Sequence, residues 1–168
     1  GGVGTGRFAG ALGVAWGVDP SRPMLQLSRP RLRHPVQAAG ENLPFRTHTF
    51  AAVLLVVTLC FVQHPRRVLQ EIHRVLRPGG WVVGGWIPEG SPWATHYRIR
   101  GQQGHPLYRI ARFHSRESVE AWLQEAGFQP PRYRSTLDIP PATTPPHTAS
   151  QEGFRPHAGF VCFAARRG

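Results

Sequence analysis

Hydrophobic residues recur along the chain in short blocks that alternate between strand-like and helix-like spacing. The run Phe50–Val57 is apolar throughout and rich in Val, which is typical of a central parallel strand buried on both faces. In residues 65–76, by contrast, Val68, Leu69 and Ile72 mark one face at helical spacing, with charged residues opposite. Such alternation predicts an α/β fold in which helices cover a mostly parallel sheet.

The same pattern predicts the remaining elements. Ser21 and Ser115 have the side chain and the position of helix N-caps, and Gly127 ends the second of these helices. Phe8 and Leu12 are expected to point inward from a short helix near the N-terminus. Strands are expected at residues 14–18, 36–39, 81–87, 130–137 and 160–165, and further helices at 7–13, 21–30 and 115–127.

Residues 88–112 show no clean helical or alternating pattern and concentrate aromatic side chains. The segment follows an expected strand, at the sheet end where ligands of open α/β sheets bind. Trp93, Tyr97 and Tyr108 are therefore predicted to line a substrate pocket, and the Arg and His residues of the segment to orient a polar or anionic substrate. The alternative is that the aromatic residues simply cover the end of the sheet.

Three glycines alternate at Gly2, Gly4 and Gly6, just before an expected helix. This spacing suits a tight turn at which a ligand approaches the backbone, with helix amides aimed at the ligand. Asp19 ends the next expected strand, where a carboxylate can accept hydrogen bonds from two ribose hydroxyls. Together they favour a bound nucleoside, although glycines also serve ordinary turns.

At 168 residues the chain is long enough for one domain with a sizeable core. Cys60 and Cys162 lie far apart inside apolar segments, which favours a reducing, cytoplasmic compartment. The longest nearly apolar run, Phe50–Val62, is too short to cross a bilayer, and we expect no membrane association. No pair of His or Cys residues has the spacing of a metal site, so no metal is expected.

The formal net charge is +11, with twenty Arg and no Lys. A basic balance is typical of proteins that bind nucleic acid or another anion. Here the Arg residues are scattered rather than clustered, and the complete exclusion of Lys indicates a coding bias. The sequence therefore disfavours nucleic acid as a partner.

Five motifs occur in an order that resembles the class I S-adenosylmethionine-dependent methyltransferases, of the small-molecule kind. The resemblance covers nearly the whole chain, and it depends on the order because any one motif would be a weak signal. The motifs are Gly2–Ala9, Gly17–Ser21 with Met24, Glu41–Phe45, Arg74–Gly80 and Ala126–Phe128.

This resemblance implies a Rossmann-like three-layer sandwich with strand order 3-2-1-4-5-7-6, in which the last strand is antiparallel. It implies one methyltransferase domain over residues 1–168, with residues 88–112 as a substrate lid, S-adenosylmethionine as cofactor and a small-molecule methyl acceptor. It assigns no catalytic residue and no oligomeric state. The cofactor-binding residues that it implies are Gly2, Gly4, Gly6, Asp19, Pro20, Met24, Gly40, Glu41, Thr58 and Leu59.

The sequence also departs from the family pattern. The family's first strand, which ends in an acid just before the glycine loop, is absent, so the natural protein is expected to be longer at its N-terminus. Ala39, Ala51 and His64 stand where the family has acidic residues. These losses leave open a catalytically inactive, methyltransferase-like binding protein, and the glycine loop with Asp19 also fits a nicotinamide-dependent oxidoreductase.

Overall fold

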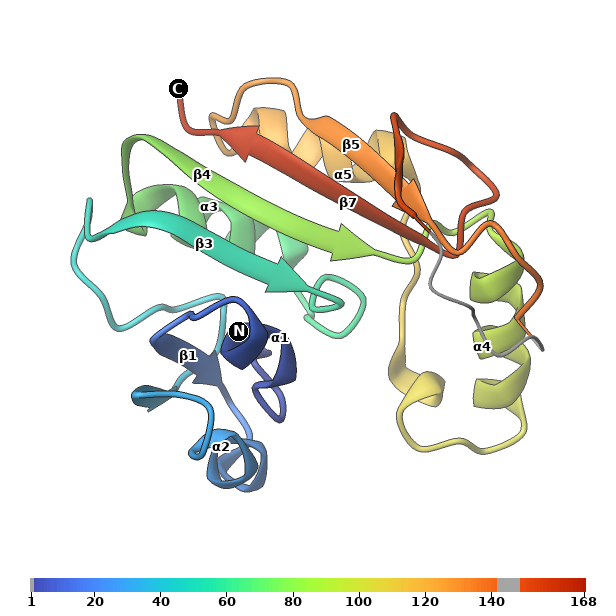
Figure 1. Cartoon of the computed structure of the whole chain (residues 1–168), viewed down its shortest axis with the longest axis horizontal. Coiled ribbons are helices and arrows are strands. Elements are labelled where there is room, and N and C mark those ends of the chain that lie inside the picture. Colours follow the sequence, from blue (N-terminus) through green and yellow to red (C-terminus); the bar gives the residue numbers. More distant parts are fainter. Residues whose placement is uncertain (1, 142–148) are drawn as a thin grey trace.

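The computed structural model describes residues 2–141 and 149–168, and its strands form two sheets (Figure 1). In the smaller sheet, β1 (Trp16–Asp19) and β2 (His34–Gln37) are parallel. The larger sheet has the order β3-β4-β7-β5-β6, with β3 parallel to β4 and β7 antiparallel to both β4 and β5. Its strands are β3 (Phe50–Val56), β4 (Leu76–Trp86), β7 (Phe160–Arg166), β5 (Arg132–Thr136) and β6 (Gln151–Glu152).

This arrangement is the expected Rossmann-like order with its central position open. Read across the molecule, the strands run β2-β1, then a gap, then β3-β4-β7-β5. Among the described residues no strand pairs with the inner edges of β1 and β3, and a largely apolar cavity of about 370 Å³ lies between them. The fold is therefore the predicted one, and the cavity occupies the position of the central strand.

The expectation that Phe50–Val57 is buried on both faces is wrong. Within β3 only Leu55 is fully buried, whereas Ala51 and Ala52 are exposed. The physical reason is that β3 pairs only with β4 and borders the cavity on its other edge.

Helices α3 and α5 lie side by side behind the larger sheet (Figure 1). Serine side chains cap three of the helices: Ser21, Ser91 and Ser115 accept hydrogen bonds from amides in the first turns of α2, α4 and α5. The helices are α1 (Arg7–Ala11), α2 (Arg22–Ser28), α3 (Pro65–Val75), α4 (Pro92–Gln102) and α5 (Arg116–Glu125), with a 3₁₀ turn η1 (Tyr108–Ile110).

The core forms around α3. Val68, Leu69, Ile72 and Val75 are at most 2% exposed, which confirms the predicted inner face. They belong to one cluster with large side chains of the sheet and α5, including Trp86, Leu123 and Phe163. The hydrophobic stripe of α3 therefore anchors the larger sheet.

The expected inner face of the N-terminal helix is wrong. Phe8 and Leu12 are 61% and 64% exposed, and only Ala9 of α1 is buried. This five-residue helix approaches its neighbours through small residues: a Cβ added at Gly6 would lie 3.1 Å from Ser28 Cβ. Phe8 instead lines the cavity between β1 and β3, which is why its side chain is exposed.

Residues 88–112 are more regular than their pattern suggested, since they contain the eleven-residue helix α4. The signal for this helix is Ser91 followed by Pro92, because a serine N-cap and a proline in the first turn both favour helix initiation. Across the described ranges, no helix is long and apolar enough to span a membrane.

We expect Leu69→Ala to lower the free energy of unfolding by about 2–5 kcal/mol, because it leaves a cavity beneath the sheet. Leu27→Ala is the matched control: Leu27 lies on α2 and is 55% exposed, so its change should stay within about 0.5 kcal/mol. Denaturant unfolding of both variants measures the difference. An equal, small effect of the two substitutions would show that the face of α3 is wrongly assigned.

Candidate functional site

The glycine loop is held at the end of β1. The backbone amides of Gly2 and Val3 both donate hydrogen bonds to the Val18 carbonyl, at 2.8 and 3.0 Å. Gly2, Gly4 and Gly6 have φ angles of 117°, 54° and 74°, a region that side-chain-bearing residues rarely adopt. The alternating glycines are therefore required by the path of the backbone itself.

Asp19 joins this loop to α2. Its carboxylate is only 6% exposed; Oδ2 accepts a hydrogen bond from the Gly4 amide and Oδ1 one from the Ser21 amide, each at 2.9 Å. A carboxylate has about four acceptor positions, so each oxygen retains a lone pair for a ligand hydroxyl. Asp19 thus fixes the loop and still has the capacity to bind a ribose.

The glycines differ in their surroundings. A Cβ added at Gly2 would lie 2.8 Å from Thr58 Oγ1, so the glycine loop and the residue just beyond β3 meet here. A Cβ at Gly4 would meet nothing within 4 Å, so open space lies beside the Gly4–Asp19 contact. Gly6, in contrast, serves the packing of α1 on α2.

Thr58 and Leu59 follow β3 and play different parts. Thr58 is 5% exposed and donates a hydrogen bond to the Val56 carbonyl at 3.1 Å, beside the glycine loop. The Leu59 side chain is 1% exposed and belongs to the core, while its carbonyl lies 3.1 Å from His114 Nε2. Any contact of Leu59 with a ligand would therefore involve its backbone.

The other two predicted residues near the start of α2 lie at the surface. Pro20 is exposed, and its carbonyl accepts a hydrogen bond from Gln37 Nε2 at 3.2 Å. Met24 is 40% exposed, which removes the alternative that it is a core residue.

Gly40 and Glu41 start the loop that leads from β2 toward β3. Gly40 is buried. The Glu41 carbonyl accepts a hydrogen bond from Arg67 Nε at 3.3 Å, and its Oε1 accepts one from the His64 amide at 3.5 Å. Glu41 therefore lies against the first turns of α3, and the role of His64 in this structure is to begin that helix.

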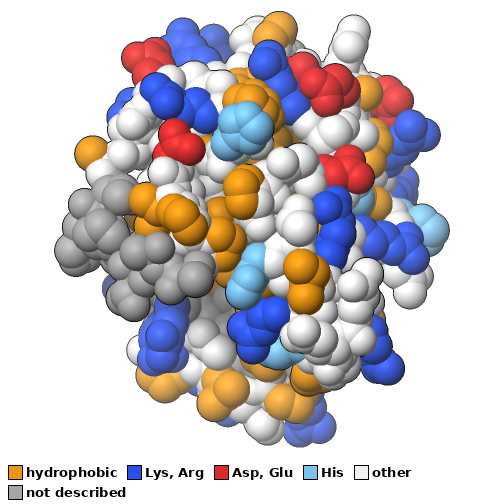
Figure 2. Space-filling view, turned by 90° about the vertical axis from the view of Figure 1, so that its right-hand side faces the viewer, with side chains coloured by type: hydrophobic (Ala, Val, Ile, Leu, Met, Phe, Trp, Pro, Cys, Tyr) orange, Lys and Arg blue, Asp and Glu red, His pale blue; other side chains and the backbone are white. Residues whose placement is uncertain are grey.

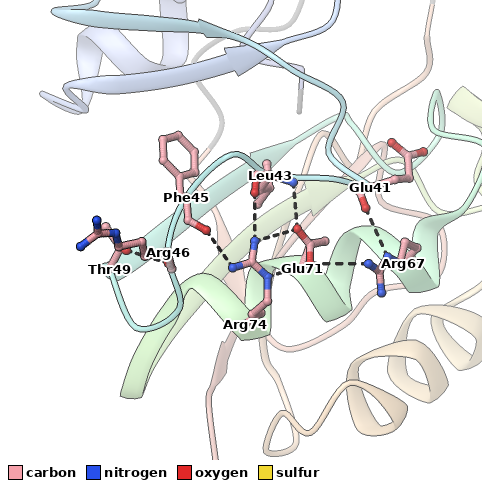
Figure 3. A network of polar contacts seen from close by, with 8 residues as sticks. All are labelled: Glu41, Leu43, Phe45, Arg46, Thr49, Arg67, Glu71 and Arg74. Atoms are coloured by element: carbon pink, nitrogen blue, oxygen red, sulfur yellow. Dashed lines mark hydrogen bonds and ion pairs between the residues drawn. The ribbon is translucent and has the colours of Figure 1, made fainter.

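A polar network that sequence analysis missed holds the same loop (Figure 3). Glu71 accepts hydrogen bonds from the Leu43 amide at 2.8 Å and from Arg74 Nε at 2.8 Å. Arg74 also donates to the carbonyls of Phe45 at 2.7 Å and Leu43 at 2.9 Å. The sequence signal for this network is the Glu71–Arg74 pair at i, i+3 spacing on α3. From the pattern alone, these two residues belong to the charged face of the helix.

Electrostatics in this network favour the charged forms of both side chains. The hydrogen bond from Arg74 lowers the pKa of Glu71, although burial opposes the shift, and the Leu43 amide adds to the lowering. The hydrogen bond to Glu71 in turn raises the pKa of Arg74. Glu71, 4% exposed, is thus a buried carboxylate whose charge is compensated by its partners.

The predicted substrate-pocket residues come together around one aromatic cavity of about 390 Å³. The ring centroids of Trp93 and Tyr97 are 6.0 Å apart, and those of Tyr97 and Tyr108 are 4.4 Å apart. Val57 and Ile87, which follow β3 and β4, are part of its lining, so it lies at the carboxyl ends of these strands.

Chemically, this cavity is apolar, and two ionisable groups in its lining hold their protons firmly. Its described lining residues include no charged side chain and no His. Burial raises the pKa of the Cys60 thiol to about 12 and also raises the pKa of Tyr97. Both groups are therefore protonated at neutral pH.

Comparison with known proteins places this geometry in a family. The model of a family described as "Methyltransferase domain" matches residues 1–84. A crystal structure from Thermotoga maritima, described as a SAM-dependent methyltransferase and possible histamine N-methyltransferase, superposes with a TM-score of 0.92 and 32% identity, covering 99% of this chain and 79% of that one.

Two curated relatives agree. An uncharacterised protein of Mycobacterium bovis is 43% identical over 165 residues, which are 98% of this chain and 58% of that protein. A ubiquinone/menaquinone biosynthesis C-methyltransferase of Blochmanniella floridana is 35% identical over 82 residues, 44% of this chain and 32% of that protein. The chain therefore spans little more than half of its mycobacterial relative.

The chain belongs to the methyltransferase-domain family and has the fold of class I S-adenosylmethionine-dependent methyltransferases. Family and fold imply S-adenosylmethionine as the cofactor. The residues present fit it at the glycine loop: open space at Gly4 adjoins the spare lone pairs of Asp19, and Thr58 closes the loop's other end.

We expect Asp19→Ala to weaken binding of S-adenosylhomocysteine by about tenfold or more, because hydrogen bonds to a charged group contribute about 1.5–3 kcal/mol. The substitution removes both the anchor of Gly4 and the proposed ribose acceptor. Asp138→Ala is the matched control, since Asp138 is half exposed and pairs with Arg155 away from the loop. Calorimetric titration of both variants measures the effect; unchanged affinity in Asp19→Ala would contradict the assignment.

Proposed function

We propose that the protein transfers the methyl group of S-adenosylmethionine to a small, largely apolar acceptor held in the aromatic cavity. The observation that carries this proposal is the position of the cavity. It lies at the carboxyl ends of β3 and β4, and Phe8, from the helix after the glycine loop, borders it. A molecule in the cavity would therefore adjoin a cofactor bound at the glycine loop.

The cavity indicates what the protein itself would contribute to methyl transfer. Bound S-adenosylmethionine supplies an already activated methyl group. Aligning two reactants can account for about 7–11 kcal/mol of a barrier, so holding the acceptor in line with this methyl group is the contribution that we assign to the cavity, and the acceptor's proton is released to solvent. Trp93 is fixed for this purpose by a hydrogen bond from Nε1 to the Ile139 carbonyl at 2.8 Å, and α4 covers the acceptor against water.

The character of the acceptor follows from the lining. Arg98 pairs with Glu89 at 3.6 Å and lies over the Phe113 ring, and Arg100 lies over the Tyr108 ring at 5.4 Å. Since these guanidinium groups are not part of the described lining, we revise the sequence-based expectation of a polar or anionic acceptor to an apolar one. The names of the Blochmanniella and Thermotoga relatives both point to small molecules, which supports a small acceptor.

The surface supports a small molecule over nucleic acid. On the face that contains α4, Arg side chains are dispersed among hydrophobic and acidic ones rather than joined in one basic patch (Figure 2). Nucleic acid binding typically uses a continuous basic stripe or groove. Family membership likewise favours methyl transfer over the nicotinamide-dependent alternative.

We expect the double substitution Trp93→Ala, Tyr97→Ala to lower methyl transfer at least tenfold, about 1.4 kcal/mol in the barrier. Affinity for S-adenosylhomocysteine should stay within about threefold, because these rings line the acceptor cavity and not the glycine loop. The assay uses aromatic phenols and thiols as acceptors. Ile99→Ala is the matched control, on the same helix with a side chain 48% exposed.

Two results would contradict this assignment. If cofactor affinity and transfer fall together, α4 is structural. If neither changes while the parent protein is active, the acceptor binds elsewhere. If the parent protein binds the cofactor but methylates none of these acceptors, the result would favour the inactive, methyltransferase-like alternative. Ala51 and His64 support that alternative, because they stand where the family has acidic residues.

A further inference from the structure

We propose that the Glu71–Arg74 pair is a positioning device for the cofactor, because it fixes the loop 40–45, which contains the predicted binding residues Gly40 and Glu41. The inference rests on the proposed function, since it assumes a cofactor that contacts this loop. Neither side chain is among the predicted binding residues. Both act through the loop 40–45.

The pair grips this loop by its backbone. Glu71 binds the Leu43 amide, and Arg74 binds the Leu43 carbonyl, so both polar groups of one peptide residue are fixed (Figure 3). Arg74 then holds the Phe45 carbonyl two residues further along. One turn earlier on α3, Arg67 binds the Glu41 carbonyl at 3.3 Å. The loop therefore follows α3 along its length, in a single register.

The pair is also rigid. The planar guanidinium group of Arg74 donates to two backbone carbonyls and to both Glu71 oxygens, which uses its fork geometry fully. Glu71 is nearly inaccessible to water, on a helix whose inner face is buried in the core. Since an unpaired charge at such a site is strongly unfavourable, the two side chains have little freedom to separate.

The loop matters because it links the two sheets. Among the residues that the structure describes, the hydrogen bonds of residues 2–39 stay within that half or reach the loop. Other direct contacts between the two halves are packing contacts. The rings of Trp16 and Phe50 lie 6.4 Å apart between centroids, and Gly2 lies against Thr58. The loop is therefore a polar connection between the two sheets.

This loop contains two of the predicted cofactor contacts. Asp19 and the glycine loop belong to the smaller half, and Gly40 and Glu41 to the loop. Thr58 and the aromatic cavity belong to the larger sheet. Because ordering a loop on binding costs affinity, a ligand that contacts this loop binds more tightly when the loop is already held in place. Glu71 and Arg74 thus act as positioning residues, without contact to the ligand.

The experiment compares two matched ion pairs in the complete natural protein. Glu71→Gln places an amide nitrogen toward the donors of Arg74, and Arg74→Lys keeps the charge but loses the fork. Glu120→Gln and Arg116→Lys are the controls, because Arg116 Nε also donates to Glu120 at 2.8 Å, on α5 and away from the loop. Melting temperature and calorimetric affinity for S-adenosylhomocysteine are measured for all four variants.

We expect Glu71→Gln and Arg74→Lys to raise the Kd for S-adenosylhomocysteine about tenfold or more. The Kd is measured at a temperature well below the melting temperatures of both variants. The two α5 controls should lower the melting temperature while leaving the Kd within about threefold of the parent. Amide hydrogen exchange at Leu43 should accelerate only in the α3 variants, because its acceptor is Glu71.

The inference is overturned if the α3 variants keep the parent Kd, or if the Kd rises equally in the α5 controls. A parent protein that does not bind S-adenosylhomocysteine would instead overturn the proposed function. Amide hydrogen exchange then tests separately whether the pair holds the loop. Unchanged exchange at Leu43 in Glu71→Gln would show that it does not.

Discussion

The structure depends on one buried carboxylate. Glu71 lies on the helix whose hydrophobic stripe forms the core, and it is the point where the core is connected to the loop between the two sheets. A charge in this position is tolerated because Arg74 and the Leu43 amide bind it from several sides. The same helix therefore performs two tasks: its apolar face packs against the larger sheet, and its polar edge holds the loop between the two sheets.

This arrangement separates the molecule into two functional halves. The smaller half provides a preformed glycine loop. The positive φ angles of its glycines and the hydrogen bonds to Asp19 give the loop its shape without a ligand. The larger half provides an apolar container, formed by α4 and the ends of β3 and β4. Methyl transfer requires alignment more than acid–base chemistry, so a preformed loop and a fitted cavity are the properties that matter.

Membership of the methyltransferase-domain family defines the cofactor more firmly than the acceptor. The glycine loop and Asp19 lie at the end of β1, where the backbone of an open α/β sheet turns and can meet a nucleoside. In the function that we propose, the acceptor contacts the segment after β4, where Trp93, Tyr97 and Tyr108 come from a helix and a 3₁₀ turn rather than from the scaffold. Relatives with different acceptors can therefore share the fold, and function must be argued from the cavity.

The sequence alone determined the elements whose signals are local. Helical spacing marked the buried face of α3, serine caps marked the starts of α2 and α5, and alternating glycines marked the loop. Tertiary structure decided what local patterns do not contain. Phe8 borders two cavities rather than the core, and Trp93, Tyr97 and Tyr108 come together around one of these cavities. Glu71 and Arg74 read as an ordinary charged pair in sequence, because their function depends on backbone atoms twenty-eight or more positions away that only folding brings within hydrogen-bond distance.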